Sequence, residues 1–190
     1  MKRIVVGLSG ASAAIYGIRL LEVLHSLEVE SHLVITDPAR DIIALETEYD
    51  VAQVEALASY VYQVRDLGAA ISSGSFKTDG MVVVPCSIKT LSAVANSYND
   101  NLLVRAADVT LKERRRLVLV VRETPLHTGH LNLMKMVSEM GAVVYVPVPA
   151  FYALPKTIGD IVDHTVGRIL DLFDLEHDLV SRWNRLPGPA

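Results

Sequence analysis

The sequence holds one cysteine, no excess of positive charge and no long apolar run, and each scarcity excludes a class of protein. Because Cys86 is the only cysteine, an intrachain disulfide is impossible, and a cytoplasmic, reducing location is expected. The net charge of -4 argues against nucleic acid as a partner, since nucleic-acid binders carry basic surfaces. No apolar run reaches the roughly 20 residues that span a bilayer, so no membrane association is expected.

Several motifs of known chemistry are also missing. The glycines at positions 7, 10 and 17 do not form the dinucleotide pattern G-x-G-x-x-G, no P-loop lysine follows them, and no G-x-S-x-G elbow occurs. His127 and His130 are three residues apart, but no third ligand has metal-site spacing, so we interpret the pair as structural. Cys86 has no neighbouring base and is expected to be a small buried hydrophobic residue.

The composition is that of a globular chain with a large core. Hydrophobic residues make up 51% of the 190 residues, enough for one domain that buries roughly 70% of its unfolded surface. The mean hydropathy of +0.32 is high, so further copies of the chain are expected to cover part of the apolar surface. Short apolar runs predict strands at 3–8, 32–36, 59–64, 80–84, 117–121 and 142–146. Helical periodicity predicts helices at 11–27, 37–46, 53–58, 88–94, 101–113, 130–140 and 157–173.

This alternation predicts the fold class. Continuous apolar strands between amphipathic helices indicate an α/β fold, a Rossmann-like doubly wound parallel sheet with helices on both faces in a single domain. Ligands of such sheets bind beyond the carboxyl ends of the strands, at the topological switch point. The segments that follow the strands therefore hold the candidate site residues.

The first such segment, Ser9-Gly10-Ala11-Ser12-Ala13, joins a strand to a helix that is expected to begin at Ala11. Backbone N–H groups at a helix N-terminus favour an anion, and Ser9 and Ser12 are natural N-caps that add hydroxyl donors. An ordinary strand-to-helix turn explains the stretch equally well. Pro85-Cys86-Ser87 repeats the layout after a later strand, so two turns are candidates for phosphate binding.

Charged candidates lie in the second half of the chain. Arg122 follows a strand and can hold a planar anion, while the neighbouring Glu123 can orient that anion or move a proton. A structural ion pair is an equal alternative for these two residues. Tyr152 and Arg168 are candidates for a second anion pocket, although their spacing does not decide it. The basic run at 112–116 is interpreted as a solvated turn.

Together these motifs resemble those of the flavin prenyltransferase family, the UbiX type, which includes the small component of microbial hydroxyarylic acid decarboxylase systems. The matching stretches cover almost the whole chain in the family's order: SGAS at 9–12, YG at 16–17, ET at 46–47, SGS at 73–75, PCS at 85–87, TLS at 90–92, RAADV at 105–109, LKER at 111–114, RETP at 122–125, HL at 130–131, PAFY at 149–152 and RIL at 168–170.

The resemblance implies a reaction. The family joins a dimethylallyl group from dimethylallyl monophosphate to N5 and C6 of reduced FMN, without a metal. The product, prenylated FMN, is passed to a decarboxylase of the UbiD type. Members of the family are homo-oligomers, typically dodecamers, in which neighbouring subunits contribute site residues. By this resemblance, residues 1–175 form the flavin-binding domain and residues 176–190 form a tail that closes the active site.

The resemblance also assigns roles to individual residues. The expected flavin-binding residues are Gly10, Ala11, Ser12, Thr36, Ser87, Ile88, Lys89, Thr90 and Arg122. The expected clamp for the allyl phosphate consists of Arg105, Lys112, Tyr152 and Arg168. The expected catalytic residues are Ser12, Glu46, Glu123 and Trp183, of which the two glutamates would handle protons and Trp183 would enclose the allyl group.

The chain departs from the family pattern in two places. Asp37 stands where a lysine often follows Thr36, and Asn132-Leu133 replaces the usual Glu-Asn. Neither departure removes a residue of the expected phosphate clamp. Two alternatives stay open. One is a flavin-dependent cysteine decarboxylase of the same fold, although the histidine expected of such enzymes is missing near residues 46–50. The other is a non-catalytic flavin-binding subunit of a decarboxylase complex.

Overall fold

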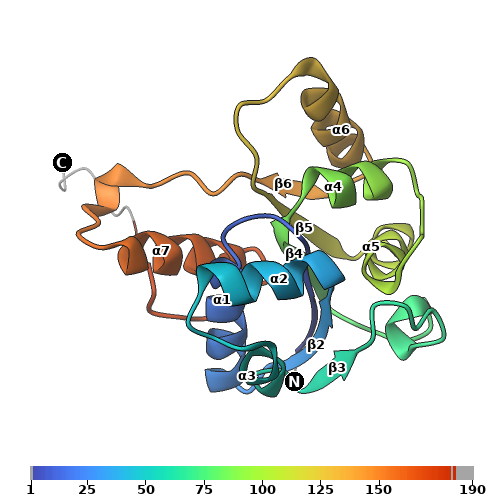
Figure 1. Ribbon diagram of the computed structural model, residues 1–190, viewed down its shortest axis with the longest axis horizontal. Helices are drawn as coiled ribbons and strands as arrows, with labels where there is room; N and C mark the ends of the chain where they lie inside the picture. The colour runs from blue at the N-terminus through green and yellow to red at the C-terminus, as the bar shows by residue number, and fades with distance from the viewer. Residues whose placement is uncertain (1, 181, 183–190) are drawn as a thin grey trace, which may run out of the picture. The chain divides into compact units, whose positions relative to one another are not determined.

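Six parallel strands form one sheet in the order β3-β2-β1-β4-β5-β6, which is the doubly wound arrangement expected from the sequence (Figure 1). The strands are β1 (Arg3–Leu8), β2 (Glu30–Ile35), β3 (Tyr60–Tyr62), β4 (Gly80–Cys86), β5 (Arg116–Val121) and β6 (Val143–Tyr145). This computed structural model describes residues 2–180 and 182. Its contacts divide the chain into two compact units, Met1–Pro147 and Val148–Ala190, and all six strands belong to the first.

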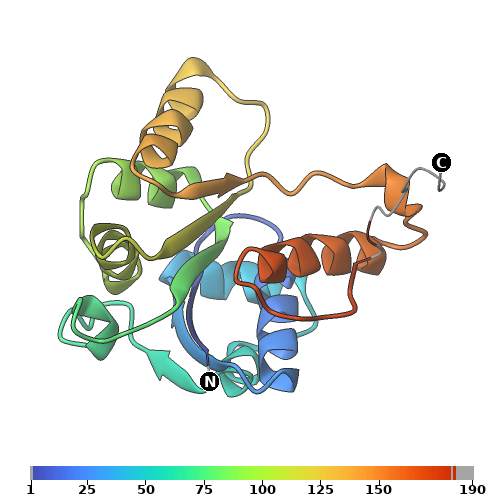
Figure 2. The same ribbon diagram turned by 180° about the vertical axis from the view of Figure 1, so that it is seen from behind.

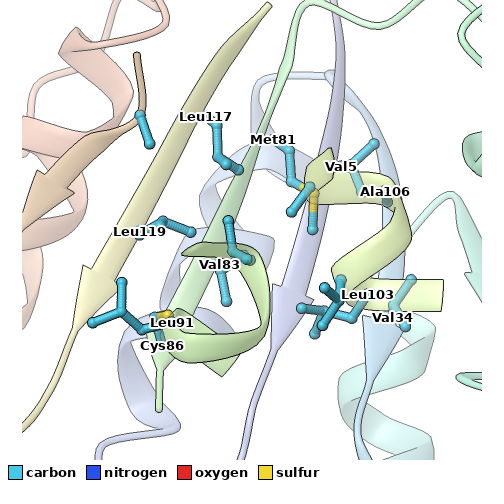
Figure 3. Packing of buried hydrophobic residues seen from close by; sticks show 14 of the residues in the cluster. Val5, Val34, Met81, Val83, Cys86, Leu91, Leu103, Ala106, Leu117 and Leu119 are labelled. Atoms are coloured by element: carbon cyan, nitrogen blue, oxygen red, sulfur yellow. The ribbon is translucent and has the colours of Figure 1, made fainter. Parts of the chain in front are cut away.

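The central strands β1 and β4 are buried, except at Arg3 where β1 begins, because helices cover both faces of the sheet. Leu8 contacts Gly17 of helix α1 (Ile15–Ser26), where an added Cβ would lie 2.5 Å from the carbonyl oxygen of Val84. Val5, three residues from Leu8 and so on the opposite face, belongs to a cluster with residues of helices α4 (Ile88–Ala95) and α5 (Leu102–Lys112). Figure 3 shows this second face, with Leu91 and Leu103 of these helices packed over the strands.

The remaining helices of the first unit are α2 (Asp37–Glu46), α3 (Val51–Ala56), the short 3-10 helix η1 (Ala70–Ser72) and α6 (Thr128–Glu139). Both views of the ribbon show α4, α5 and α6 gathered at the β4–β5–β6 side of the sheet (Figure 1; Figure 2). The bounds of α2 agree with the prediction because Thr36 accepts a capping hydrogen bond from the Ala39 N–H and Pro38 suits the first turn.

The predicted start of helix α1 is wrong. Helix α1 begins at Ile15 and not at Ala11, and its N-cap is Ala14, without any side-chain capping bond. Ser9 and Ser12 therefore do not cap α1. The intervening loop includes Ala13 in the left-handed region, at φ 78°, which a helix cannot include. The loop after β1 is consequently longer than the sequence pattern predicts.

A buried histidine, His32 of β2, packs its ring against Tyr60 of β3. The Nε2 atom of His32 is 2.8 Å from Oε1 of Glu30, and its Nδ1 atom is 2.9 Å from the hydroxyl of Tyr62. Glu30 also accepts a hydrogen bond from Arg3. Burial lowers the pKa of His32 below its ordinary value, although the Glu30 carboxylate opposes the shift.

The second unit contains the 3-10 helix η2 (Phe151–Ala153) and helix α7 (Ile158–Asp171). A capping box between Thr157 and Asp160 begins α7. The proposed tail at 176–190 falls within this unit, and the boundary at residue 175 stays a prediction. Trp183 lies outside the described residues. No helix among the residues that the structure describes has the length and apolar character of a membrane span.

Candidate functional site

The topological switch point of the sheet lies between β1 and β4. These two strands pair directly, yet the chain leaves β1 toward β2 on one side and β4 toward β5 on the other. The loops that follow β1 and β4 therefore diverge and leave a crevice at the carboxyl edge. A pocket of about 490 Å³ opens at this edge.

Three helix N-termini contribute to this pocket. Its lining includes the N-cap residues of α2, α4 and α5, which are Thr36, Ser87 and Asn101. Free backbone N–H groups and helix dipoles at such termini favour an anionic ligand. The complete lining is Gly10, Thr36, Asp37, Pro38, Val64, Arg65, Ser87, Ile88, Lys89, Thr90, Ala93, Asp100, Asn101, Val104 and Glu123.

The pocket brings together much of the predicted flavin site. Gly10, Thr36 and the whole segment Ser87–Thr90 line it, although they come from three separate loops. Glu123, a predicted proton carrier, lines it as well. The predicted residues Ala11, Ser12 and Arg122 are not part of the lining.

Charged side chains of both signs surround the pocket. Arg65 lies 3.6 Å from Asp37, and Lys89 lies 3.9 Å from Asp100. Exposed pairs such as these contribute only about 0–1 kcal/mol each, so an anionic ligand can compete for the two cations. Asp37, the departure from the family pattern, thus stands beside a cation from another loop.

The loop after β1 contacts helix α2 at two points. Gly10 lies against Pro38, because an added Cβ would come within 2.4 Å of the Pro38 Cβ atom. Further along, the backbone N–H of Ala13 donates to Oε2 of Glu46 over 2.7 Å. The half-buried Ser12 directly precedes Ala13, the residue that Glu46 contacts. Two of the predicted catalytic residues, Ser12 and Glu46, therefore lie close to this hydrogen bond.

Ser9 does not have the expected position. Only 1% of it is exposed, and its hydroxyl is hydrogen-bonded inside the protein, so it is not a donor to a ligand. Cys86 is fully buried, and burial raises the pKa of its thiol to about 12, which agrees with its interpretation as a structural residue. The backbone N–H of the exposed Arg122 donates to the carbonyl of Cys86 over 3.2 Å.

Two of the predicted clamp residues lie on α5. The Nε atom of Arg105 donates to the carbonyl of Ser72 over 3.2 Å, and its NH1 atom pairs with Asp108 over 2.8 Å. Lys112 pairs with Glu113 over 2.5 Å, which lowers the pKa of that carboxyl group.

Lys112 ends α5 just before β5 begins at Arg116, at the edge of the sheet opposite the pocket. At about 3.3 Å per residue, β5 separates these edges by roughly 17 Å. The neighbouring basic run is not simply a solvated turn, because Arg115 donates to the carbonyl oxygens of Gly74 and Phe76.

The other two clamp residues belong to the second unit. The hydroxyl of Tyr152 lies 3.2 Å from Nε2 of His164, and Arg168 follows His164 by about one helical turn on α7. The pKa of His164 is lowered by burial and, to a smaller extent, by the charge of Arg168. Arg168 itself pairs with Asp171 over 2.6 Å, so α7 holds its guanidinium group in a defined position.

The histidine pair follows β5, and His127 has a structural role at the start of α6. The rings of His127 and His130 lie 3.6 Å apart, and His127 caps α6 by accepting from the Gly129 N–H. Within residues 2–180 and 182, no three histidine, cysteine or acidic side chains form a group that could hold a metal ion.

Sequence reasoning missed several residues of the pocket. Arg65 and Val64 precede η1 in a loop that carries no recognisable motif, and only the fold brings them to the carboxyl edge. Asn101 had a detectable signal, since an asparagine before an apolar helix is a preferred N-cap.

Comparisons with known proteins identify a matching family model and relatives over nearly the whole chain. The flavoprotein family model matches residues 1–170. A flavin prenyltransferase UbiX from Thauera aromatica is 59% identical over 181 residues, which are 95% of this chain and 93% of that protein.

Two solved structures are also similar along nearly their full length. A UbiX protein (AnUbiX, PadA1) in complex with FMN and dimethylallyl pyrophosphate has a TM-score of 0.96 and 52% identity, covering 98% of this chain and 99% of that one. A dodecameric FMN-dependent UbiX-like decarboxylase from Escherichia coli O157:H7 has a TM-score of 0.94 and 49% identity, covering 96% and 100%.

Proposed function

Because the chain belongs to the flavin prenyltransferases of the flavoprotein family, we propose that it joins a dimethylallyl group from dimethylallyl monophosphate to reduced FMN. The product is prenylated FMN, and its recipient is a decarboxylase of the UbiD type. FMN is thus both the bound flavin and the acceptor of the transferred group.

The convergence of Gly10, Thr36 and Ser87–Thr90 in one pocket carries this proposal. The volume of about 490 Å³ lies in the range of roughly 300–1,000 Å³ that is typical of pockets for ligands of this size. The helix N-termini at Thr36, Ser87 and Asn101 suit a phosphate group, so the lining fits a flavin mononucleotide.

Reduced FMN supplies the N5 and C6 atoms to which the dimethylallyl group is joined. The chain supplies positions and proton carriers. Glu123 lines the pocket and is placed to accept or return a proton there, as a carboxylate within reach of a ligand can. Ser12 acts from the loop after β1, and Glu46 acts from the end of α2, where its carboxylate accepts a hydrogen bond from the Ala13 N–H. Arg122 is proposed to contact the flavin.

The allyl phosphate is proposed to bind to Arg105, Lys112, Tyr152 and Arg168, whose charges neutralise the leaving phosphate. Since Lys112 lies at the sheet edge opposite the pocket, the complete site requires Lys112 from another copy of the chain. This requirement supports a homo-oligomer, and we propose the dodecamer reported for the Escherichia coli O157:H7 protein. A cytoplasmic location is part of the same proposal.

Mass spectrometry of the flavin tests the reaction. Anaerobic incubation of the chain with reduced FMN and dimethylallyl monophosphate is expected to yield FMN that is heavier by one prenyl unit. Unchanged FMN, with the flavin demonstrably bound, would instead favour a non-catalytic flavin carrier. Oxidative decarboxylation of a peptide with a C-terminal cysteine would favour a cysteine decarboxylase.

Two variants make the assay specific to the proposed residues. Glu123→Gln keeps the size of the side chain but removes the ionisable carboxyl group, so bound FMN with much slower product formation is expected. The matched control is Glu139→Gln, because Glu139 lies at the end of α6 and pairs only with Lys135 among the ion pairs of the described residues. Equal rates in the two variants would contradict the role of Glu123.

A further inference from the structure

The regular register of paired residues between β1 and β4 ends before the carboxyl edge of the sheet. The paired residues run from Ile4 and Gly80 to Gly7 and Val83. Pro85 follows shortly afterwards and has no N–H group to donate. The two loops that lead to the candidate flavin pocket therefore lack regular backbone pairing at the point where they diverge.

Ser9 replaces the missing pairing with its side chain. Its hydroxyl donates to the carbonyl of Pro85 over 2.9 Å and accepts from the Ser87 N–H over 2.8 Å. Its own N–H also donates to the Pro85 carbonyl, over 3.2 Å. Since 1% of Ser9 is exposed, water has little access to its hydroxyl group. A hydroxyl can donate and accept at once, which an alanine or valine of similar size cannot do.

The residue held by Ser9 is itself a wall of the pocket. Ser87 caps α4 by accepting from the Thr90 N–H, and its hydroxyl donates to the Thr90 hydroxyl over 3.1 Å. Gly10, the neighbour of Ser9, lines the opposite loop of the same pocket. A shift at Ser9 is thus transmitted to both loops.

We infer that Ser9 is a positioning residue for FMN, which fixes the β1 loop to the N-terminus of α4 without touching the ligand. The inference rests on the proposed function. Without the hydroxyl, the partly buried N–H of Ser87 loses its partner within the protein, and FMN has to order the two loops as it binds. The affinity for FMN is expected to fall by about tenfold or more in Ser9→Ala.

Ser31 offers a matched control. It is also 1% exposed, and its hydroxyl likewise accepts a backbone N–H from another segment, that of Ser59 over 3.1 Å. It lies near the start of β2, at the sheet edge away from the pocket. Ser31→Ala should therefore lower stability without changing the affinity for FMN.

The experiment compares FMN titrations of the wild type, Ser9→Ala and Ser31→Ala at a temperature where all three are folded. Ser9→Ala is expected to weaken FMN binding, to alter the absorption bands of the bound flavin and to leave KM for the allyl phosphate unchanged at saturating FMN. Equal FMN affinities in the two variants would overturn the inference and leave the proposed function standing. A wild type that binds no FMN would overturn both.

A second pair covers the case in which Ser9→Ala does not fold. Ser9→Cys and Ser31→Cys keep nearly the same side-chain volume, but sulfur is a weak acceptor. A selective loss of FMN affinity in Ser9→Cys supports the positioning role. If both Ser9 variants fail to fold while the Ser31 variants fold, Ser9 serves the fold and not the site, and the inference is wrong.

Discussion

Gly10→Ala tests the contact between the β1 loop and α2 that shapes the pocket. In the structure, the added Cβ would lie 2.4 Å from the Pro38 Cβ atom, whereas ordinary contacts begin at 3.4 Å. The loop or the first turn of α2 must therefore move by about 1 Å. Pro38 cannot give way by a rotamer change, because its Cβ belongs to a ring fused to the backbone.

Overpacking of this kind costs about 1–3 kcal/mol of unfolding free energy. Since Gly10 and Pro38 both line the pocket, the same movement displaces two of its walls. A displacement of this size in a binding site can cost about a hundredfold in rate. We expect the FMN dissociation constant to rise by about tenfold or more, and kcat/KM to fall further.

The assay combines urea unfolding with FMN titration monitored by flavin fluorescence. Gly159→Ala is the control, because among the described residues an added Cβ there meets only Thr157, at 3.5 Å, in the exposed first turn of α7. That substitution should leave both measurements unchanged or raise stability slightly. If Gly10→Ala keeps wild-type stability and FMN affinity, the proposed close contact at this wall is wrong.

Three further predictions concern other parts of the chain. The pKa of His32 is lower in the folded state than its ordinary value of about 6.5. Its contribution to stability is therefore complete above that pH and is lost as the pH falls toward the folded-state pKa. Between pH 7 and pH 5, the unfolding free energy measured in urea should fall less in His32→Gln than in the wild type. Arg168→Ala should raise KM for the allyl phosphate by about tenfold, the loss of one charge-assisted contact, while FMN affinity stays within about twofold; equal losses of both would refute two separate subsites. Lys112→Ala and Ser12→Ala should each be inactive alone. When the two variants are dissociated and reassembled together, partial activity should return, because some sites of the mixed oligomers then hold both wild-type residues. No recovery in verified mixed oligomers would show that Lys112 and Ser12 of one site come from the same copy.

The sequence predicts elements well where a local signal specifies their ends. Thr36 and Pro38 define the start of α2, and continuous apolar runs locate β4 and β5. The predicted start of α1 is wrong because its N-cap, Ala14, makes no side-chain capping bond. No residue type in the sequence marks a helix start of this kind. The parallel order of the strands followed from their alternation with helices.

The site could be predicted only in part. Ser87–Thr90 follows a buried strand, so its position at the carboxyl edge was implied by the fold class. Arg65 reaches the pocket through a loop whose course no periodic pattern determines. The hydrogen bonds of the Ser9 hydroxyl could not be predicted from the sequence. Their partners, Pro85 and Ser87, lie far from Ser9 along the chain and meet it only in the folded sheet.

The most direct test of the proposed site is a crystal structure of the chain with FMN and dimethylallyl monophosphate bound. We expect flavin density in the pocket between Gly10, Thr36 and Ser87, with Lys112 of a neighbouring copy near the allyl phosphate. Flavin bound elsewhere on the chain, or a pocket that stays empty while FMN is bound in solution, would contradict this expectation.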